Sequence, residues 1–179
     1  LTDGRKYFFA RPVTFAFRGM HYGRYGSGAD DARLTPLYVG NDQFVRGYSL
    51  YSFTADECGA SGSSDSCPAF DRLIGTRIAV ANAEIRVPLF GSRQFGLIHT
   101  SFLPIDLAAF VDAGTAWTSS ESVDLRFDRN TADRVPVFSA GLATRINVLG
   151  FAVAEIFYAR PFQRPTKSGV WGVQLVPGW

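Results

Sequence analysis

The chain has 179 residues with a formal net charge of +2, and 46% of its residues are hydrophobic, 15% aromatic and 19% charged. These values exclude long disordered tracts, and so small a charge excludes an electrostatic surface for nucleic acid. No run of about 18 apolar residues occurs, which excludes a membrane-spanning helix, but the mean hydropathy of +0.03 is typical of a transmembrane β-barrel, whose strands alternate apolar and polar residues.

Near the start of the chain, a strand is predicted over residues 13–24 and a weaker one over residues 5–9. In the longer stretch, Phe15 and Phe17 lie on one face and Arg18 lies on the other. Aromatic residues opposite arginines indicate a strand between lipid and a polar lumen, and the length suits a tilted strand that crosses a bilayer.

The segment 36–72 lacks strand or helix periodicity, and we predict a long loop there. Its first half is rich in aromatic residues, which indicates a packed loop. Within it, Cys58 and Cys67 flank a polar stretch, and such a pair can close a small disulfide loop in an oxidising compartment. Two free thiols are the alternative. No histidine lies in this stretch, so no metal site is expected.

The second half of the chain alternates strands with loops. Residues 74–87 place alanines on one face, and Pro88 is predicted to end this strand because proline cannot donate to a ladder. In the next strand, over residues 103–111 and beyond, Asp106 and Asp112 lie behind a continuous apolar face, which fits a barrel wall better than a dry core. Further strands are predicted over 138–148, 152–158 and 169–179, with a polar loop over 118–134 and a tight turn at Leu149-Gly150.

These elements predict an all-β fold: an antiparallel transmembrane β-barrel or part of one, with about six to eight strands in a single domain over residues 1–179. Six strands are clear, and residues 5–9 and 37–51 are weaker candidates. Long loops alternate with tight turns, as in outer-membrane barrels. The alternative is a soluble β-sandwich or lipocalin-like barrel, but charges that recur on one face of several strands favour the membrane.

The motif Val45-Arg46-Gly47-Tyr48 resembles the VRG-aromatic signature in the sixth extracellular loop of the BamA/TamA superfamily of outer-membrane barrels. Four further segments match that family in the same order, and Trp179 is similar to the terminal aromatic residue of its members. The matching segments are Ala83-Glu84-Ile85-Arg86-Val87-Pro88, Phe110-Val111-Asp112-Ala113-Gly114-Thr115-Ala116-Trp117, Ser139-Ala140-Gly141 with Leu149-Gly150, and Tyr158-Ala159-Arg160-Pro161-Phe162.

The resemblance implies a location in the outer membrane of a Gram-negative-type bacterium and a role in protein insertion or translocation. It also implies that the chain is the C-terminal part of a longer protein. The implied partners are outer-membrane lipid, client β-barrel proteins or an upstream periplasmic domain, and a second copy of the chain. The alternative function is a passive small pore, or a membrane anchor for a missing upstream domain.

The resemblance further implies that the long loop 36–72 folds into the lumen, where Arg46 meets Glu84 and Asp112 on the barrel wall. Both carboxylates lie on the polar faces of their predicted strands, and the planar fork of arginine can engage carboxylates at two points. Such a cluster would hold the loop in position. The alternative is three independently solvated charges.

Catalysis finds little support in the chain. His21 and His99 are the only histidines, and neither the G-x-S-x-G nucleophile motif nor a G-x-G-x-x-G helix opening occurs. We therefore expect no enzymatic activity, no cofactor and no metal.

Overall fold

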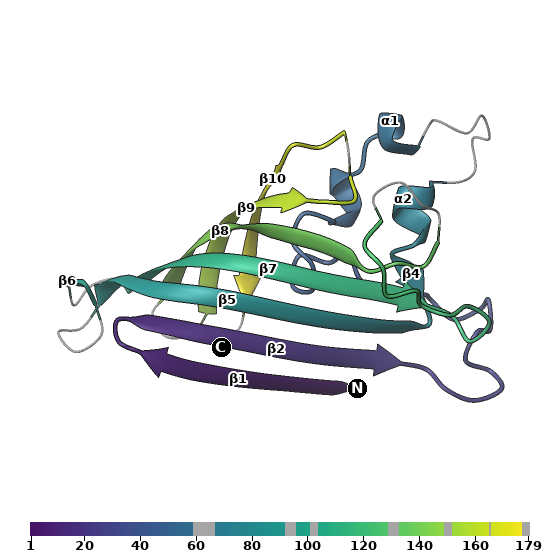
Figure 1. The fold of residues 1–179 in the computed structure, drawn as a ribbon, viewed down its shortest axis with the longest axis horizontal. Helices are drawn as coiled ribbons and strands as arrows, with labels where there is room; N and C mark the ends of the chain where they lie inside the picture. The colour runs from purple at the N-terminus through teal and green to yellow at the C-terminus, as the bar shows by residue number, and fades with distance from the viewer. Residues whose placement is uncertain are drawn as a thin grey trace.

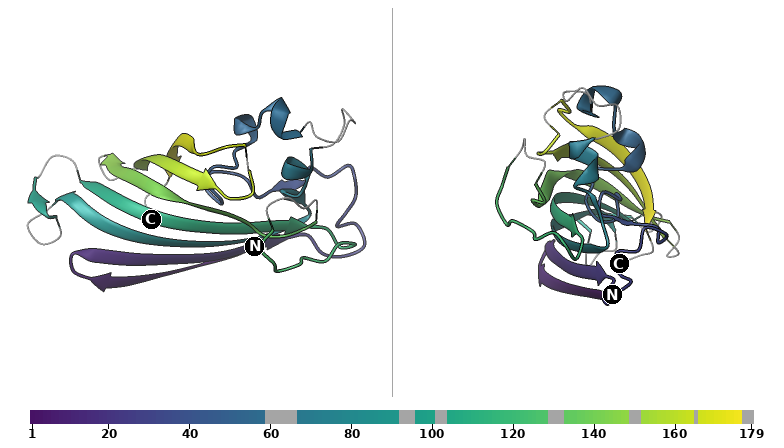
Figure 2. Two further views of the ribbon diagram at one scale, coloured as in Figure 1. Left: turned by 45° about the horizontal axis from the view of Figure 1, so that its top comes forward. Right: turned by 90° about the vertical axis from the view of Figure 1, so that its right-hand side faces the viewer.

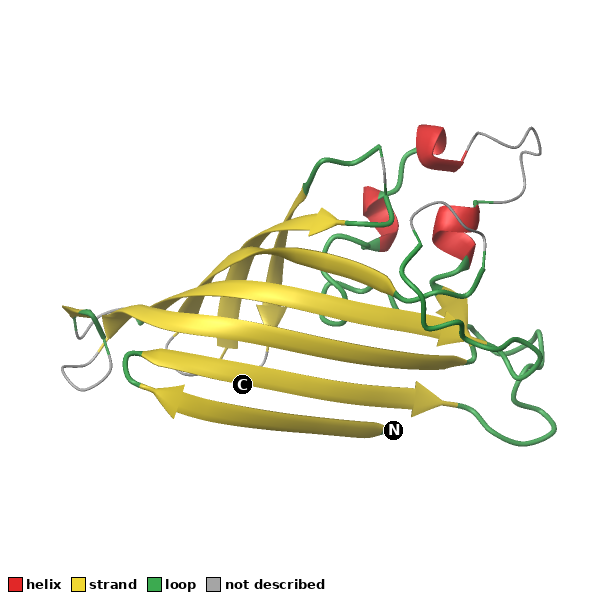
Figure 3. Ribbon diagram, viewed as in Figure 1, coloured by secondary structure: helices red, strands yellow, loops and turns green. Residues whose placement is uncertain are grey.

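The computed structural model describes residues 1–58, 67–91, 96–100, 104–128, 133–148, 152–164 and 166–176. Within them the protein is a curved antiparallel sheet with a long loop segment and three short helical turns gathered at one end (Figures 1 and 3). The expected all-β fold is confirmed. None of the described helices is long and apolar enough to cross a membrane.

Seven long strands in the described part of the chain form the sheet as a meander in which each strand pairs antiparallel with the next (Figure 1). We call the end that carries the long connections the loop end and the opposite end the turn end. The strands in order are β1 (Thr2–Ala10), β2 (Val13–Gly23), β5 (Arg77–Gly91), β7 (Ile105–Trp117), β8 (Val137–Val148), β9 (Ala152–Pro161) and β10 (Val170–Val176).

The short elements belong to the connections. The pair β3 (Leu37–Tyr38) and β4 (Ile74–Gly75) closes the base of the long loop, and β6 (Ile98–His99) pairs parallel with the end of β5. The remaining elements are η1 (Leu50–Ser52), α1 (Ala55–Cys58) and α2 (Pro68–Asp71).

Three sequence expectations change in the structure. The weak candidate at residues 5–9 is a full strand of nine residues, whereas the candidate at 37–51 contains only the two residues of β3. The expected end of a strand at Pro88 is wrong, because β5 continues to Gly91. The register between β5 and β7 shifts between Pro88 and Phe90, and this irregularity lets the strand pass a residue that cannot donate to the ladder. The turn at Leu149-Gly150 and Trp179 lie outside the described residues.

The two faces of the sheet differ sharply in chemistry. The outward face exposes apolar side chains, among them Phe17, Val111 and Val173. The concave face carries charged and polar residues on successive strands, such as Arg18 and Asn82. Apolar side chains toward the outside and polar ones toward the inside are the pattern of a transmembrane barrel wall.

The sheet is an open arc of such a wall. Among the described residues, β1 pairs only with β2, and β10 pairs only with β9. Because seven strands alternate in direction, β1 and β10 both run from the loop end to the turn end, and direct pairing between them would be parallel. Antiparallel closure therefore requires an odd number of further strands, in line with the even strand numbers of bacterial single-chain barrels.

The loop segment packs against the concave face of the arc, as Figure 2 shows. Its buried residues Val39, Val45 and Tyr48 form one core with Ile78 and Val80 of β5. Burial of this apolar area places the loop inside the arc, next to the polar residues of the wall.

Candidate functional site

The loop motif Val45-Arg46-Gly47-Tyr48 is buried along its whole length. Gly47 has a positive φ of 87°, a conformation that residues with a Cβ adopt only with strain. Gly114 on β7 leaves the space that Val45 fills, because a Cβ at this glycine would lie 2.5 Å from Val45 Cγ2. These two glycines allow the loop backbone to approach the wall closely.

Tyr48 ties the loop to the segment that follows β9. Its hydroxyl lies 2.9 Å from both the Phe138 carbonyl oxygen and Gln163 Oε1, and it accepts a hydrogen bond of 3.1 Å from the Gln163 N–H. Burial raises the pKa of Tyr48 to about 12, so the hydroxyl stays protonated and able to donate.

Arg46 binds three carboxylates that come from three different strands. Its Nε and Nη2 donate to the two oxygens of Asp112 at 2.8 Å each, and its backbone N–H donates to Asp112 at 3.2 Å. Nη2 also lies 2.8 Å from Glu84 Oε1, and Nη1 donates to Glu155 Oε1 at 3.0 Å. The guanidinium carbon lies 3.5 Å from the centre of the Phe110 ring, which supports the fork from one face.

Two further arginines complete the cluster. Arg86 donates to Glu84 at 2.8 Å, and Arg145 lies 3.0 Å from Glu84 and 3.6 Å from Glu155. Together, three arginines face three carboxylates, so the cluster is formally neutral. We define the wall cluster as Arg46, Glu84, Arg86, Asp112, Arg145 and Glu155.

The wall cluster is buried, which decides what it contributes. Arg46 and Glu84 are each 4% exposed, and Asp112 is fully buried. Moving these charges out of water costs free energy that offsets most of their mutual attraction, so the net stabilisation of the fold is small. Removing one partner leaves an uncompensated buried charge, and this destabilises the fold by several kcal/mol. Asn82 extends the network by donating to Asp112 at 2.8 Å and to the Phe44 carbonyl at 2.7 Å. The arrangement therefore fixes the position of the loop.

The structure brings together Arg46, Glu84 and Asp112, the three residues that the family resemblance implies, and their burial excludes three independently solvated charges. Sequence reasoning did not place Arg86, Arg145 or Glu155 in this cluster. The available signal was that Glu155 is the only charged residue on the inward face of β9, directly opposite Arg145 in the register of β8 and β9.

A second anchor holds the part of the loop that the wall cluster does not reach. Arg164, which follows β9, is buried and donates to the Gly47 carbonyl at 2.7 Å, to the Ser52 carbonyl and hydroxyl at 2.6 and 2.7 Å, and to both oxygens of Glu57 at 2.7 and 2.8 Å. Its guanidinium lies 4.0 Å from the centre of the Phe53 ring. We call this group the Arg164 anchor.

The Arg164 anchor is expected to weaken in acid. Burial of Glu57 opposes ionisation, but the hydrogen bonds from Arg164 and Thr54 outweigh it, so the pKa of Glu57 lies below its ordinary value. A carboxyl whose pKa is lowered by folding stabilises the fold fully above its ordinary pKa of about 4.3. This contribution is lost as the pH falls through the lower pKa of the folded state. The protection factors of the amide groups in η1 and α1 should therefore fall below about pH 4 in wild type. In Glu57→Gln, this fall in protection should be absent. A variant whose protection factors fall with pH as those of wild type do would contradict the role of Glu57.

Cys58 and Cys67 are joined by a disulfide in the structure, with a Cα–Cα distance of 4.3 Å. The bridge links the end of α1 to the residue before α2 and so closes the loop just beyond Glu57. Its chain-entropy contribution is about 2–3 kcal/mol for a loop of this size. Intact-mass measurement without reduction should show a protein lighter by two hydrogen atoms than the reduced form. Alkylation of both thiols in native protein would count against the bridge.

Comparison with known proteins gives a match over most of the chain. A family model described as the Omp85 superfamily domain matches residues 11–178. No curated protein matches the chain, and no solved structure matches it. The matched range contains the loop motif, every residue of the wall cluster and the Arg164 anchor.

Proposed function

Because the chain belongs to the Omp85 superfamily, a family of outer-membrane proteins associated with protein insertion and translocation, we propose that it acts as a BamA/TamA-type barrel in the outer membrane of a Gram-negative-type bacterium. In this role it inserts or translocates client proteins without catalytic chemistry and without a cofactor. Its partners are outer-membrane lipid, client β-barrel proteins and an upstream periplasmic domain, and a second copy is a further candidate.

The observation that carries this proposal is the loop held against the inside of the barrel wall by the wall cluster. Burying six charges costs desolvation free energy, which is not expected for a loop that only connects two strands. A loop held in this way keeps the inner surface of the wall in one defined shape. Beside it, β10 presents an edge with no strand partner among the described residues, and its side chains Trp171, Val173 and Leu175 are exposed. Such an edge can receive a client strand through main-chain hydrogen bonds.

The test is assisted insertion in proteoliposomes. The full-length protein is reconstituted, a urea-unfolded client barrel protein is added, and protease-protected folded client is measured over time. Wild type should accelerate insertion over empty liposomes, and Arg46→Ala should reduce the acceleration. The matched control is Arg33→Gln, which removes an arginine whose side chain is 88% exposed and whose partner among the described residues is Asp31, two positions away. No acceleration by the wild-type protein would contradict the proposal.

A passive pore is the second candidate, and the polar concave face favours it. Planar-bilayer recordings separate the two functions. A steady ohmic conductance in protein that does not accelerate insertion would support the pore. The anchor alternative predicts neither conductance nor insertion, but attachment of an upstream domain to the membrane.

A further inference from the structure

The connection between β7 and β8 carries an exposed segment in which apolar and charged residues alternate. In chain order these residues are Val123, Asp124, Leu125, Arg126, Phe127 and Asp128. Leu125 is 84% exposed and Phe127 is 56% exposed. Large apolar side chains that gather in one exposed segment mark a contact surface. We call residues 123–127 the amphipathic segment.

The amphipathic segment lies over the outward face of the wall at the loop end. Val123 and Leu125 line a hollow of about 380 Å³ together with Ala79 of β5 and Trp117 of β7. These two wall residues alternate with the residues of β5 and β7 that pack against the long loop, so they face outward. In the right-hand view of Figure 2, the connection that follows β7 lies on the side of the sheet opposite to the long loop.

Aromatic side chains mark the level of the membrane boundary at this end of the wall. Trp117 is the last residue of β7, and the His21 ring stacks on it with ring centroids 5.6 Å apart. Phe127 of the amphipathic segment lies with its ring centroid 5.7 Å from that of Phe138, near the start of β8. Aromatic residues at the ends of the outward face form the girdles of transmembrane barrels, at the two membrane interfaces. The amphipathic segment therefore lies where hydrocarbon gives way to headgroups.

The charged residues of the segment group with one another. Arg126 lies 3.4 Å from Asp124, 3.9 Å from Asp128 and 2.5 Å from Asp133. The side chains of all four residues are 40–61% exposed, so these ion pairs remain in contact with water. The apolar residues of the segment thus lie with the wall, while its charged residues form a separate, hydrated group.

The base of the connection is fixed to the rest of the protein. Arg134 donates to the carbonyl oxygens of Asp71 and Ile74 at 2.7 Å each. Its Nε donates to Glu121 at 3.0 Å, and its own carbonyl accepts a hydrogen bond of 3.1 Å from the Asp124 N–H. These contacts hold the amphipathic segment beside the wall.

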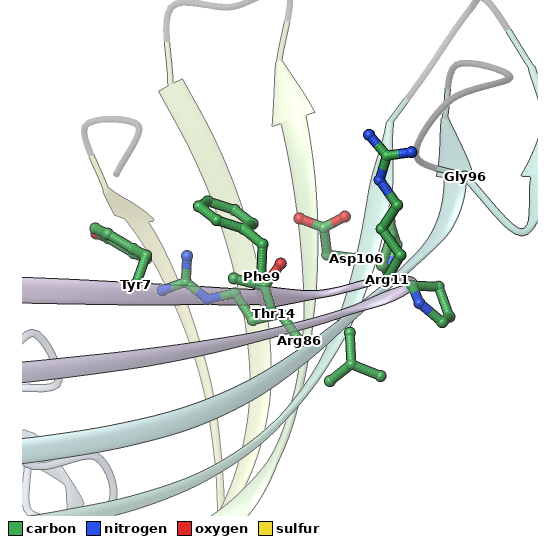
Figure 4. Close-up of a pocket in the computed structure, with 10 residues that line it drawn as sticks. Tyr7, Phe9, Arg11, Thr14, Arg86, Gly96 and Asp106 are labelled. Carbon is green, nitrogen blue, oxygen red and sulfur yellow. The ribbon is translucent and has the colours of Figure 1, made fainter.

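Exposed rings on the concave face have different neighbours. Figure 4 shows Tyr7 and Phe9 at the turn end of that face, around a hollow that is also lined by Arg11, Arg86 and Asp106. Rings among charged side chains suit a water-filled lumen. The apolar residues of the amphipathic segment instead continue the apolar outward face.

We propose that the amphipathic segment is seated in the outer leaflet of the membrane, with Val123, Leu125 and Phe127 among lipid acyl chains. The ion pairs of Arg126 lie at the headgroups. Lipid is the occupant because these side chains extend a face that meets hydrocarbon, at the level of its aromatic girdle. The leaflet is the outer one because the long connections of outer-membrane barrels lie on the extracellular side. This inference goes beyond the proposed function and does not depend on the insertion of client proteins.

The test is a depth measurement by electron paramagnetic resonance on the full-length protein in phosphatidylcholine nanodiscs. A nitroxide is attached to the introduced cysteine of Leu125→Cys, Asp124→Cys or Tyr51→Cys, and its collision rates with oxygen and with a water-soluble nickel chelate are compared. The nitroxide at position 125 should collide more with oxygen and lie about 5–10 Å below the lipid phosphates, as interfacial segments do. The nitroxide at position 124 should lie at or above the phosphates. Tyr51 is the matched control, because it is an apolar residue of the long loop that is 96% exposed, and a nitroxide there should collide more with nickel.

Each other outcome at position 125 would overturn the proposal. Collision mainly with nickel, as at position 51, would show that the segment lies in water and is open to a protein partner that the nanodiscs do not contain. Slow collision with both reagents would show that this side chain packs inside the protein. The measurement needs no insertion activity. A membrane depth at position 125 in a protein that fails to insert clients would therefore support this inference and contradict only the proposed function.

Discussion

Replacement of Arg46 by alanine is expected to release the long loop while the strands remain paired. Without the guanidinium, Glu84, Asp112 and Glu155 face one another with only Arg86 and Arg145 as cations. Removing one partner from a buried ionic network costs about 3–5 kcal/mol, mainly through the charge left uncompensated. Limited proteolysis of the reconstituted protein should show rapid cleavage within residues 36–72, and the barrel strands should stay protected.

Two variants control this result. Arg46→Lys keeps the charge but loses the two-point contact with Asp112 and the planar stacking on Phe110, so it should restore protection only in part. Arg33→Gln should cleave as wild type does, because Arg33 contacts only its neighbour Asp31 among the interactions described for it. Equal cleavage rates in wild type, Arg46→Ala and Arg46→Lys would contradict the anchoring role.

Replacement of Val111 by arginine is expected to destabilise the barrel wall by about 2–4 kcal/mol. Val111 lies at the middle of the 13 residues of β7, on the outward face, and is 51% exposed. If this position lies at the bilayer midplane, the introduced guanidinium must be transferred from water into hydrocarbon. Reversible urea unfolding in lipid vesicles measures the difference in the free energy of unfolding.

The matched control is Ala10→Arg, on the same outward face but at the turn end of β1. Near the membrane interface a charge costs only about 0–1 kcal/mol, because the side chain reaches the headgroups. A cost for Val111→Arg no greater than that for Ala10→Arg would argue that the outward face of β7 does not meet hydrocarbon.

The sequence by itself determined which side chains face outward and which face inward. Period-two alternation is a local property, because successive side chains of a strand point to opposite faces whatever the strand pairs with. Glu84 and Asp112 could therefore be placed on polar faces before any pairing was known. The loop motif could be connected to them only through the family resemblance, because Arg46 and Asp112 are 66 residues apart and no local rule links residues at that separation.

Only the tertiary structure decided which charges meet. Glu155 reaches Arg46 because the curvature of the sheet brings β5, β7 and β9 around one loop, and curvature leaves no trace in the alternation of a single strand. Arg164 could not be recognised from the sequence as an anchor of the loop, because its partners Gly47, Ser52 and Glu57 lie more than 100 residues earlier in the chain. The continuation of β5 beyond Pro88 likewise depends on the neighbouring strand β7. A shift in register between the two strands accommodates a proline that has no backbone N–H to donate.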